Sequence, residues 1–118
     1  MIFSTDMIDA ILAGRKTRTT RPKRPGAFGW ALCRYVVGRT YAVCPGGGKP
    51  GVARIRVIAV TEWDHVADIK PQEEHAQREG FATWQDFMAR WTHLYGHSPE
   101  RFHRPVWVID FELDRSPA

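Results

Sequence analysis

The sequence predicts an α+β fold in which about three helices pack on a curled, mostly antiparallel β-sheet. Three observations support this class. The predicted elements follow the order helix, strands, two helices and strand, so helices and strands do not alternate regularly. Much of 52–63 and 105–113 repeats apolar side chains at every second position, whereas 84–94 repeats them at helical spacing. The 118 residues contain no repeat and no sign of a second domain, so we expect a single domain covering 1–118.

A short amphipathic helix is predicted near the N-terminus, with Ser4 or Thr5 as its cap. Gly14 suits the left-handed backbone conformation that commonly ends a helix. Lys16 is expected in a loop and Thr19 at the entrance of a strand, because both can reach one site only if the chain turns between them. The buried face of the helix is expected to carry Ile8, Ile11 and Leu12.

Positive charge is concentrated directly after this helix. The chain has 17 Lys and Arg against 13 Asp and Glu, a net charge of +4, and six of these cations fall within 15–24. Without these six, acidic residues would outnumber basic ones. Such a local field attracts an anion or a polyanion, although a charge run is also typical of a solvated loop. The six cations are Arg15, Lys16, Arg18, Arg21, Lys23 and Arg24.

The middle of the chain is predicted to hold irregular segments around short strands. Residues 22–30 contain two prolines and two glycines and are expected to be an irregular connection. Residues 34–43 indicate one bent strand or two short ones, because two β-rich runs flank Gly38. Residues 45–51 are a flexible loop whose Gly-Gly-Gly-Lys lacks the spacing of a phosphate-binding loop.

Residues 52–63 are the most strand-like segment of the chain. The apolar Ile58 and Val60 indicate that its later half is buried on both faces. A second helix is expected to open at residue 68 and to include Glu79 in its last turn, before Gly80 stops it.

A third helix is expected after Thr83, which forms a capping-box pattern with Asp86, and it is expected to end at Gly96. A polar linker, 97–104, then leads to the last strand, 105–113. We interpret the apolar face of this helix as part of the core; it carries Trp84, Phe87, Met88, Trp91 and Leu94.

Composition argues against several classes of protein. No apolar run approaches the roughly 20 residues that a membrane span needs, and the N-terminus lacks the features of a signal peptide. The spacing of Cys33 and Cys44 gives no basis for a disulfide framework. We therefore expect a cytoplasmic protein that does not interact with membranes, and we favour a monomer.

Three histidines raise the question of a metal site. Gly96 breaks the helix between His93 and His97, so these two do not share a face as in a zinc-binding helix, and His103 follows later. We expect no metal site and no cofactor.

The pattern Gly14-Arg15-Lys16-Thr17-x-Thr19-x-Arg21, after a short N-terminal helix, resembles the signature of the ASCH domain. This resemblance implies a β-barrel related to the PUA RNA-binding fold. Similarity continues in the same order over nearly the whole chain. It includes Val37-Gly38-Arg39-Thr40-Tyr41, Asp68-Ile69, Ala76-x-x-Glu79-Gly80-Phe81, Trp91 with Tyr95, and Pro105-Val106-Trp107-Val108-Ile109-x-Phe111.

The resemblance also implies an activity. Small bacterial members of the ASCH family are amidohydrolases that remove the acetyl group from N4-acetylcytidine, using a Lys, a Thr and a Glu. Placed by motif, these residues are Lys16, Thr19 and Glu79. Other members bind nucleic acid or are ribonucleases, so the alternative is an RNA-binding module or ribonuclease that uses 15–24 together with Arg54 and Arg56.

The chemistry of the three residues fits acyl transfer. Thr19 can be the nucleophile if a base takes its proton, and a neutral Lys16 can be that base. A free lysine has a pKa of about 10.4, so Lys16 needs a lower value. Its sequence neighbours Arg15, Arg18 and Arg21 act in that direction, because nearby positive charges disfavour a protonated amine.

Glu79 occupies an unusual place, because a carboxylate in the last turn of a helix opposes the helix dipole. This indicates that another group holds it, either as part of the site or as a surface salt bridge to an arginine. In the first case Glu79 orients Lys16, positions water or passes a proton to the leaving amine.

Further residues are predicted to bind the substrate, a modified cytosine nucleoside. Arg21 can recognise the base carbonyl and Tyr41 can stack on the base, together with a tryptophan that the sequence does not identify. Thr17 and Arg39 complete the predicted set. The connection 22–37 and the loop 45–51 are longer than in the minimal amidohydrolases, which leaves room for a longer acyl group or an RNA partner.

Overall fold

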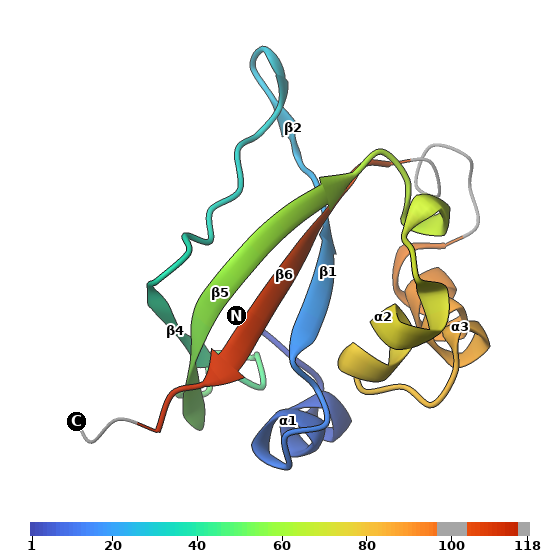
Figure 1. Cartoon of the computed structure of the whole chain (residues 1–118). Coiled ribbons are helices and arrows are strands. Elements are labelled where there is room, and N and C mark those ends of the chain that lie inside the picture. The colour runs from blue at the N-terminus through green and yellow to red at the C-terminus, as the bar shows by residue number, and fades with distance from the viewer. Residues whose placement is uncertain (97–103, 116–118) are drawn as a thin grey trace.

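The computed structural model describes residues 1–96 and 104–115, and its centre is a curled antiparallel sheet that forms half a barrel (Figure 1). The strand order is β1-β6-β5-β4, so the C-terminal strand lies between the first strand and the longest. The predicted α+β class with a PUA-like sheet is confirmed. The four strands are β1 (Arg18–Pro22), β4 (Thr40–Val43), β5 (Ala53–Trp63) and β6 (Val106–Leu113).

Helices cover the sheet in two places within the described residues. The first, α1 (Thr5–Leu12), lies at one end of β1, whereas α2 (Gln72–Arg78) and α3 (Trp84–Tyr95) pack together beside β1 (Figure 1). A short 3-10 turn, η1 (Val66–Asp68), precedes α2. The predicted cap of α3 is confirmed, because the Thr83 side chain accepts a hydrogen bond from Asp86 N at 3.1 Å. None of these helices is long and apolar enough to cross a bilayer.

Two apolar clusters fill the spaces between the sheet and the helices, and β6 contributes to both. One lies under α2 and α3, and the other lies under α1. Burial of such side chains is the main favourable contribution to folding. The first cluster contains Val66, Ile69, Ala76, Phe87, Trp91, Val106 and Val108. The second contains Phe3, Ile8, Ile11, Val43, Ile55 and Phe111.

Three apolar residues expected in the core are exposed instead. Ile58 is 50% exposed because β5 has a bulge there: Val57 pairs with Phe111 and Ala59 pairs with Asp110, so Ile58 has no partner. The expectation that the later half of β5 is buried on both faces is therefore wrong. Leu12, in the last turn of α1, is 46% exposed, and Leu94, in the last turn of α3, is 59% exposed, so neither belongs to the core.

The segment between β1 and β4 also differs from expectation. Residues 34–43 contain a single strand, β4, which begins at Thr40, and Val36 and Val37 before it are half exposed. Residues 22–30 include a small hairpin of β2 (Pro25–Gly26) and β3 (Gly29–Trp30) that projects from the sheet (Figure 1). The hairpin has no apolar period, because the side chains of its two short strands face solvent.

Gly80 ends α2 as predicted, with a φ of +95°. A Cβ at this position would lie 3.3 Å from the Lys16 Cβ and 3.5 Å from the Ala10 Cβ. Gly14, which follows α1, has a φ of +78° and open space around it. The two glycines therefore share the same backbone requirement but differ in what surrounds them.

We expect Gly80→Ala to lower the free energy of unfolding more than Gly14→Ala does. Both changes force an L side chain into the left-handed region, at about 1–2 kcal/mol. Only Gly80→Ala also brings its new Cβ to 3.3 Å from the Lys16 Cβ, which is tighter than an ordinary contact, so its total loss should be larger. Urea denaturation of both variants measures this difference, and equal losses would contradict close packing of Gly80 against Lys16.

Candidate active site

Lys16 and Glu79 form a buried ion pair between segments 63 residues apart in the sequence. Lys16 lies in the loop between α1 and β1, and its Nζ donates to Glu79 Oε1 and to the Glu79 main-chain oxygen, both at 2.9 Å. Lys16 is 4% exposed and Glu79 is 3% exposed. Burial of two charges requires such mutual compensation, because neither can be solvated by water.

This pair explains the unusual place of Glu79, which is the C-terminal cap of α2. The Lys16 ammonium faces both the carboxylate and a terminal helix carbonyl, where a cation is favoured by the helix dipole. The alternative of a surface salt bridge to an arginine is wrong. Arg78, the adjacent arginine, pairs with Glu74 instead.

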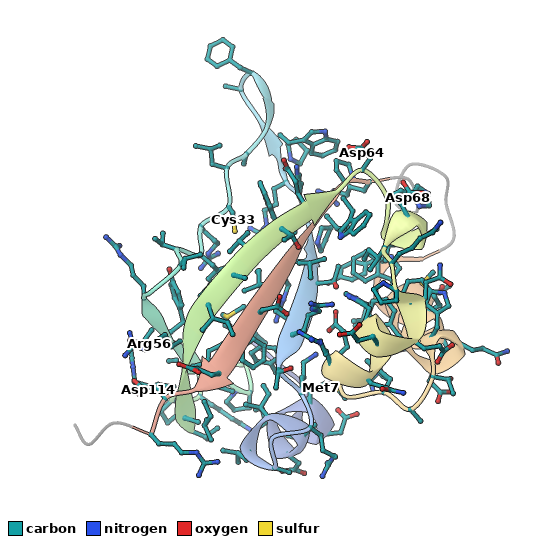
Figure 2. The ribbon with its side chains drawn as sticks, viewed as in Figure 1. Met7, Cys33, Arg56, Asp64, Asp68 and Asp114 are labelled. Atoms are coloured by element: carbon teal, nitrogen blue, oxygen red, sulfur yellow. The ribbon has the colours of Figure 1, made fainter. Side chains whose placement is uncertain are left out.

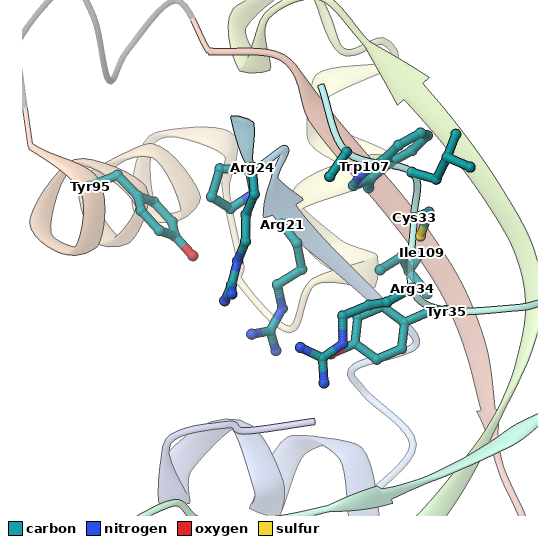
Figure 3. A pocket seen from close by; sticks show the side chains of 11 residues that line it. Arg21, Arg24, Cys33, Arg34, Tyr35, Tyr95, Trp107 and Ile109 are labelled. Carbon is teal, nitrogen blue, oxygen red and sulfur yellow. The ribbon is translucent and has the colours of Figure 1, made fainter. Parts of the chain in front are cut away.

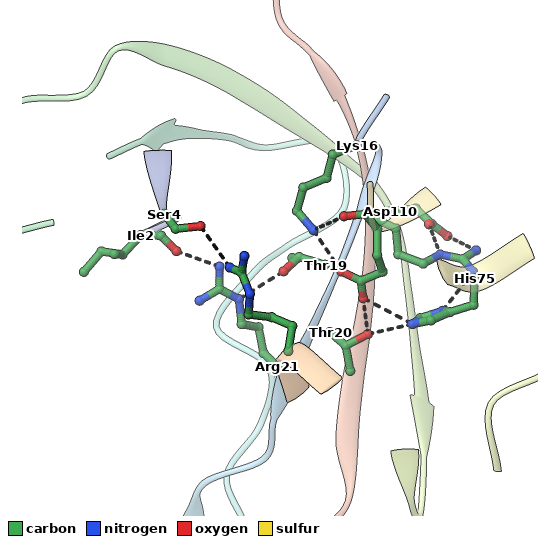
Figure 4. Close-up of polar contacts among 11 residues, drawn as sticks. Ile2, Ser4, Lys16, Thr19, Thr20, Arg21, His75 and Asp110 are labelled. Carbon is green, nitrogen blue, oxygen red and sulfur yellow. Dashed lines mark hydrogen bonds and ion pairs between the residues drawn. The ribbon is translucent and has the colours of Figure 1, made fainter. Parts of the chain in front are cut away.

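The second oxygen of the Glu79 carboxylate is held by Thr20 and His75, which lie next to each other in Figure 4. Thr20 Oγ1 donates to Glu79 Oε2 at 2.5 Å, and His75 Nε2 lies 3.2 Å from the same oxygen. Both Thr20 and His75 are buried. Glu79 thus has hydrogen-bond partners on both carboxylate oxygens, which fixes its orientation.

His75 connects this carboxylate to a second ion pair. Its Nδ1 lies 3.3 Å from Arg18 Nη1, and Arg18 also binds Asp110 through Nε and Nη2 at 2.5 and 3.2 Å. A guanidinium only donates hydrogen bonds, so His75 Nδ1 accepts and Nε2 carries the ring proton. His75 Nε2 is therefore the ring nitrogen that donates toward Thr20 and Glu79.

The electrostatics of Glu79 follow from these contacts. Burial alone would raise the pKa of the carboxyl, but the Lys16 charge and the hydrogen bonds from His75 and Thr20 outweigh it and lower the pKa from 4.5 to about 2. Glu79 is therefore ionised at neutral pH. Its ion pair with Lys16 is part of the resting structure.

A cavity of about 260 Å³ opens beside this pair. Lys16, Thr19 and Glu79, predicted to act together, all contribute to its wall. Arg21 lies in the same wall, where its Nε donates to Thr19 Oγ1 at 3.2 Å and its Nη2 donates to Ile2 O at 2.9 Å. The other walls include the apolar and aromatic side chains of Phe3, Met7, Phe81, Trp91, Leu94 and Tyr95.

Other predicted substrate-binding residues lie outside the lining of this cavity. The Tyr41 hydroxyl accepts a hydrogen bond from Val36 N at 2.7 Å, and its ring packs against the cluster under α1. Arg39 is exposed in the loop before β4. Thr17 is half-buried beside the site, where its main-chain groups bond Arg78 O and Phe111 N.

The arginines expected to crowd Lys16 are directed elsewhere. Arg18 is paired with Asp110, and Arg15 is exposed. Arg21 bonds Thr19 and a main-chain oxygen. The charge nearest to the Lys16 amine is the Glu79 carboxylate, so the electrostatics of Lys16 depend on its acidic partner more than on its basic neighbours.

Sequence reasoning missed several residues of the site. His75 and Thr20 hold the carboxylate, and Phe81 and Tyr95 line the cavity. The position of His75 four residues before Glu79, on the same face of α2, is the one local signal that could have identified it. Among the described residues, no group of three or more His, Cys, Asp or Glu is placed to hold a metal; His97 and His103 lie outside that part.

The lowered pKa of Glu79 predicts how stability depends on pH. The folded-state pKa of about 2 lies below the ordinary 4.5, so ionised Glu79 stabilises the fold fully above pH 4.5. This stability is lost as the pH falls from 4.5 through 2. The pKa difference corresponds to a loss of about 3 kcal/mol.

Urea denaturation between pH 7 and pH 2 measures this loss. We expect Glu79→Gln to lack this part of the wild-type pH dependence, because the amide does not titrate. Glu74→Gln, an exposed change in the same helix, is the matched control and should keep the wild-type profile. A Glu79→Gln variant with the wild-type profile would contradict the assigned ion pair.

Comparisons with known proteins show similarity in structure alone. No family model and no curated protein matches the sequence. The hypothetical protein PH0355 superimposes with a TM-score of 0.67 and 15% identity, covering 95% of this chain and 94% of its own. Protein EF3133 from Enterococcus faecalis V583 gives a TM-score of 0.64 and 19% identity, covering 96% of this chain and 74% of its own.

The third similar structure bears on the predicted family. It is an ASCH domain from Lactobacillus crispatus JV V101, with a TM-score of 0.61 and 20% identity, and the match covers 96% of this chain and 77% of that one. Identity of this order establishes a common fold and does not establish an activity. The expectation of an ASCH-like fold is confirmed by this likeness.

Proposed function

We propose that the protein is a metal-independent amidohydrolase that removes the acyl group from N4-acetylcytidine or a related N4-acylated cytosine nucleoside. The observation that carries the proposal is the buried Lys16–Glu79 pair, in the wall of a cavity that also holds Thr19. Acyl transfer needs a nucleophile, a group that moves its proton, and donors for the developing negative charge. The lining of the cavity includes Thr19, which offers the hydroxyl, and the Lys16–Glu79 pair, which offers the proton transfer.

In the first half of the reaction, Thr19 Oγ1 attacks the acyl carbon. One Lys16 proton first passes to Glu79 along their 2.9 Å hydrogen bond, so the neutral amine can accept the Thr19 proton. Glu79 then gives its proton to the N4 leaving group. The cytosine amine departs, an acyl ester remains on Thr19, and Lys16 and Glu79 regain their charges.

The second half repeats these transfers with water as the nucleophile. A Lys16 proton again passes to Glu79, and Lys16 accepts a proton from the attacking water. Glu79 returns its proton to the Thr19 oxygen as the ester breaks. The products are the carboxylic acid and free Thr19, so the net reaction adds one water across the amide.

Arg21 supports this assignment of the nucleophile. Its Nε donates to Thr19 Oγ1 at 3.2 Å, so a positive charge faces the oxygen that must lose its proton. The neighbouring hydroxyl of Thr20 is differently placed, because it donates to Glu79 Oε2 and also contacts His75. We therefore assign the nucleophile to Thr19 and the positioning of Glu79 to Thr20.

Trp91 supports the binding of a base in the cavity. In the described part of the chain, its Nε1 is the one buried side-chain polar atom without a hydrogen-bond partner, and Trp91 lines the cavity. An unpaired buried donor is unfavourable, so an acceptor on a bound ligand would satisfy it. We infer that Trp91 Nε1 donates a hydrogen bond to a carbonyl oxygen of the substrate.

The alternative role, RNA binding or cleavage, has weaker support. Three of the six cations in 15–24 are paired with carboxylates: Lys16 with Glu79, Arg18 with Asp110, and Lys23 with Glu62. Figure 2 places Arg56 at the β4 edge of the sheet, away from α2 and α3. The cations therefore do not form one continuous surface of the kind that follows a nucleic-acid backbone.

Hydrolysis of N4-acetylcytidine to cytidine, followed by liquid chromatography, tests the proposal. Lys16→Ala and Thr19→Ala should each lower kcat/KM by about 100-fold or more, because they remove the proton acceptor and the nucleophile. Lys49→Ala and Thr61→Ala, at exposed or half-exposed positions outside the cavity, are the matched controls and should keep wild-type rates.

Two outcomes would overturn the assignment. Absence of turnover by the intact protein over a panel of N4-acylated cytidines would remove the proposed activity. If Thr20→Val abolished acyl-enzyme formation while Thr19→Val retained it, the nucleophile would be Thr20. Mass spectrometry of the protein quenched during turnover identifies the acylated threonine.

The role assigned to Trp91 predicts a specific kinetic change. Trp91→Phe keeps an aromatic ring but removes the donor, so we expect KM for N4-acetylcytidine to rise about threefold to tenfold while kcat changes little. Trp84→Phe, in the same helix but outside the cavity lining, is the control. An unchanged KM in Trp91→Phe would contradict the assigned contact.

A further inference from the structure

A second cavity, of about 360 Å³, lies next to the one that contains Lys16. Three arginines, Arg21, Arg24 and Arg34, contribute to its wall, and its lining contains no acidic residue. In Figure 3 the three side chains follow one another across the cavity, between Tyr95 and Tyr35. The rest of the lining consists of Pro22, Ala31, Leu32, Cys33, Trp107 and Ile109.

These three cations differ from the other basic residues near the site. None of Arg21, Arg24 and Arg34 forms an ion pair with a carboxylate among the described residues, whereas Arg18 and Lys23 do. Arg21 donates to the neutral oxygens of Thr19 and Ile2, which leaves its charge uncompensated. Three positive charges facing one cavity repel each other, and an anion would remove that repulsion.

The two cavities are neighbours. Arg21 and Tyr95 line both of them, so these two side chains stand at their common boundary. Arg21 contacts Thr19 in the first cavity and faces Arg24 and Arg34 in the second. A substrate that places its acyl group near Thr19 would therefore direct its far end toward the arginines.

We propose that the arginine cavity binds the 5′-phosphate of the substrate, so that the preferred substrate is an N4-acylated cytidine 5′-monophosphate. This inference rests on the proposed function, because it assigns the base and acyl group to the Lys16 cavity. The phosphate is held by Arg21, Arg24 and Arg34. Guanidinium groups suit this role because they bind phosphate oxygens in pairs through parallel N–H donors.

The charge of the ligand favours a mononucleotide over RNA. A phosphate monoester carries nearly two negative charges at neutral pH, which matches three guanidiniums grouped in one cavity. A phosphodiester carries one charge per nucleotide, and an RNA strand would need further free cations along its path. The next cation along the chain after Arg21 is Lys23, and it is already paired with Glu62.

Product binding tests the phosphate site without depending on catalysis. By calorimetric titration, we expect cytidine 5′-monophosphate to bind about tenfold or more tightly than cytidine. Arg24→Ala and Arg34→Ala should each remove most of this difference while leaving the affinity for cytidine unchanged. Arg115→Ala, an exposed arginine near the C-terminal end of the described chain, is the matched control and should behave as wild type.

Hydrolysis kinetics give the second measurement. We expect kcat/KM to be higher for N4-acetylcytidine 5′-monophosphate than for N4-acetylcytidine, and the Arg24→Ala and Arg34→Ala variants to lose this preference but hydrolyse the nucleoside at the wild-type rate. If neither compound is hydrolysed but the nucleotide still binds through Arg24 and Arg34, the proposed function fails and the phosphate site stands.

Two results would overturn the phosphate site. If the nucleoside and the nucleotide are hydrolysed equally and their products bind equally, the activity stands without it. If a single-stranded RNA binds much more tightly than the mononucleotide, with a steep salt dependence that the Arg24→Ala and Arg34→Ala changes reduce, the cavity belongs to an RNA-binding surface.

Discussion

The buried pair of Lys16 and Glu79 is the constraint on which both the fold and the site depend. It joins the loop after α1 to the end of α2, and the close packing of Gly80 against Lys16 places the two segments in contact. Removal of one partner would leave the other as an uncompensated buried charge, at a cost of about 3–5 kcal/mol. The same contact sets the positions of the acid and the amine beside Thr19, so the chemistry of the site and the stability of the chain cannot be varied independently.

The structure separates the cations of the basic stretch, 15–24, into those that are paired with carboxylates and those that are not. Lys16 and Arg18 are balanced by Glu79 and Asp110, with His75 between the two pairs. This network of hydrogen bonds extends from the Lys16 loop to β6 and fixes the orientation of the Glu79 carboxylate. Arg21 and Arg24, which have no carboxylate partner among the described residues, line the second cavity together with Arg34. The basic stretch thus supplies both buried ion pairs and part of a cavity wall with uncompensated positive charge.

The sequence predicted the parts of the fold that depend on local signals. Gly14 and Gly80 end their helices, and Thr83 caps α3, because these roles depend on a few neighbouring residues. The bulge at Ile58 depends on the register between β5 and β6, which the β5 sequence does not contain. Likewise, only the family resemblance predicted that Glu79 and Lys16 lie in one site, since no local sequence pattern links these two residues.

The depressed pKa of Glu79 places a requirement on the substrate. In the resting site the carboxylate is ionised and the ammonium is bound to it, so neither group is yet ready to exchange protons with Thr19 or a leaving amine. Expulsion of water by a ligand strengthens the effect of burial, which raises the pKa of the carboxyl and favours the neutral pair. Under the proposed function, a substrate must therefore fill the aromatic cavity to activate the site. The proposed ligand, anchored by its base near Trp91 and by its phosphate among the arginines, would meet this requirement better than a small amide.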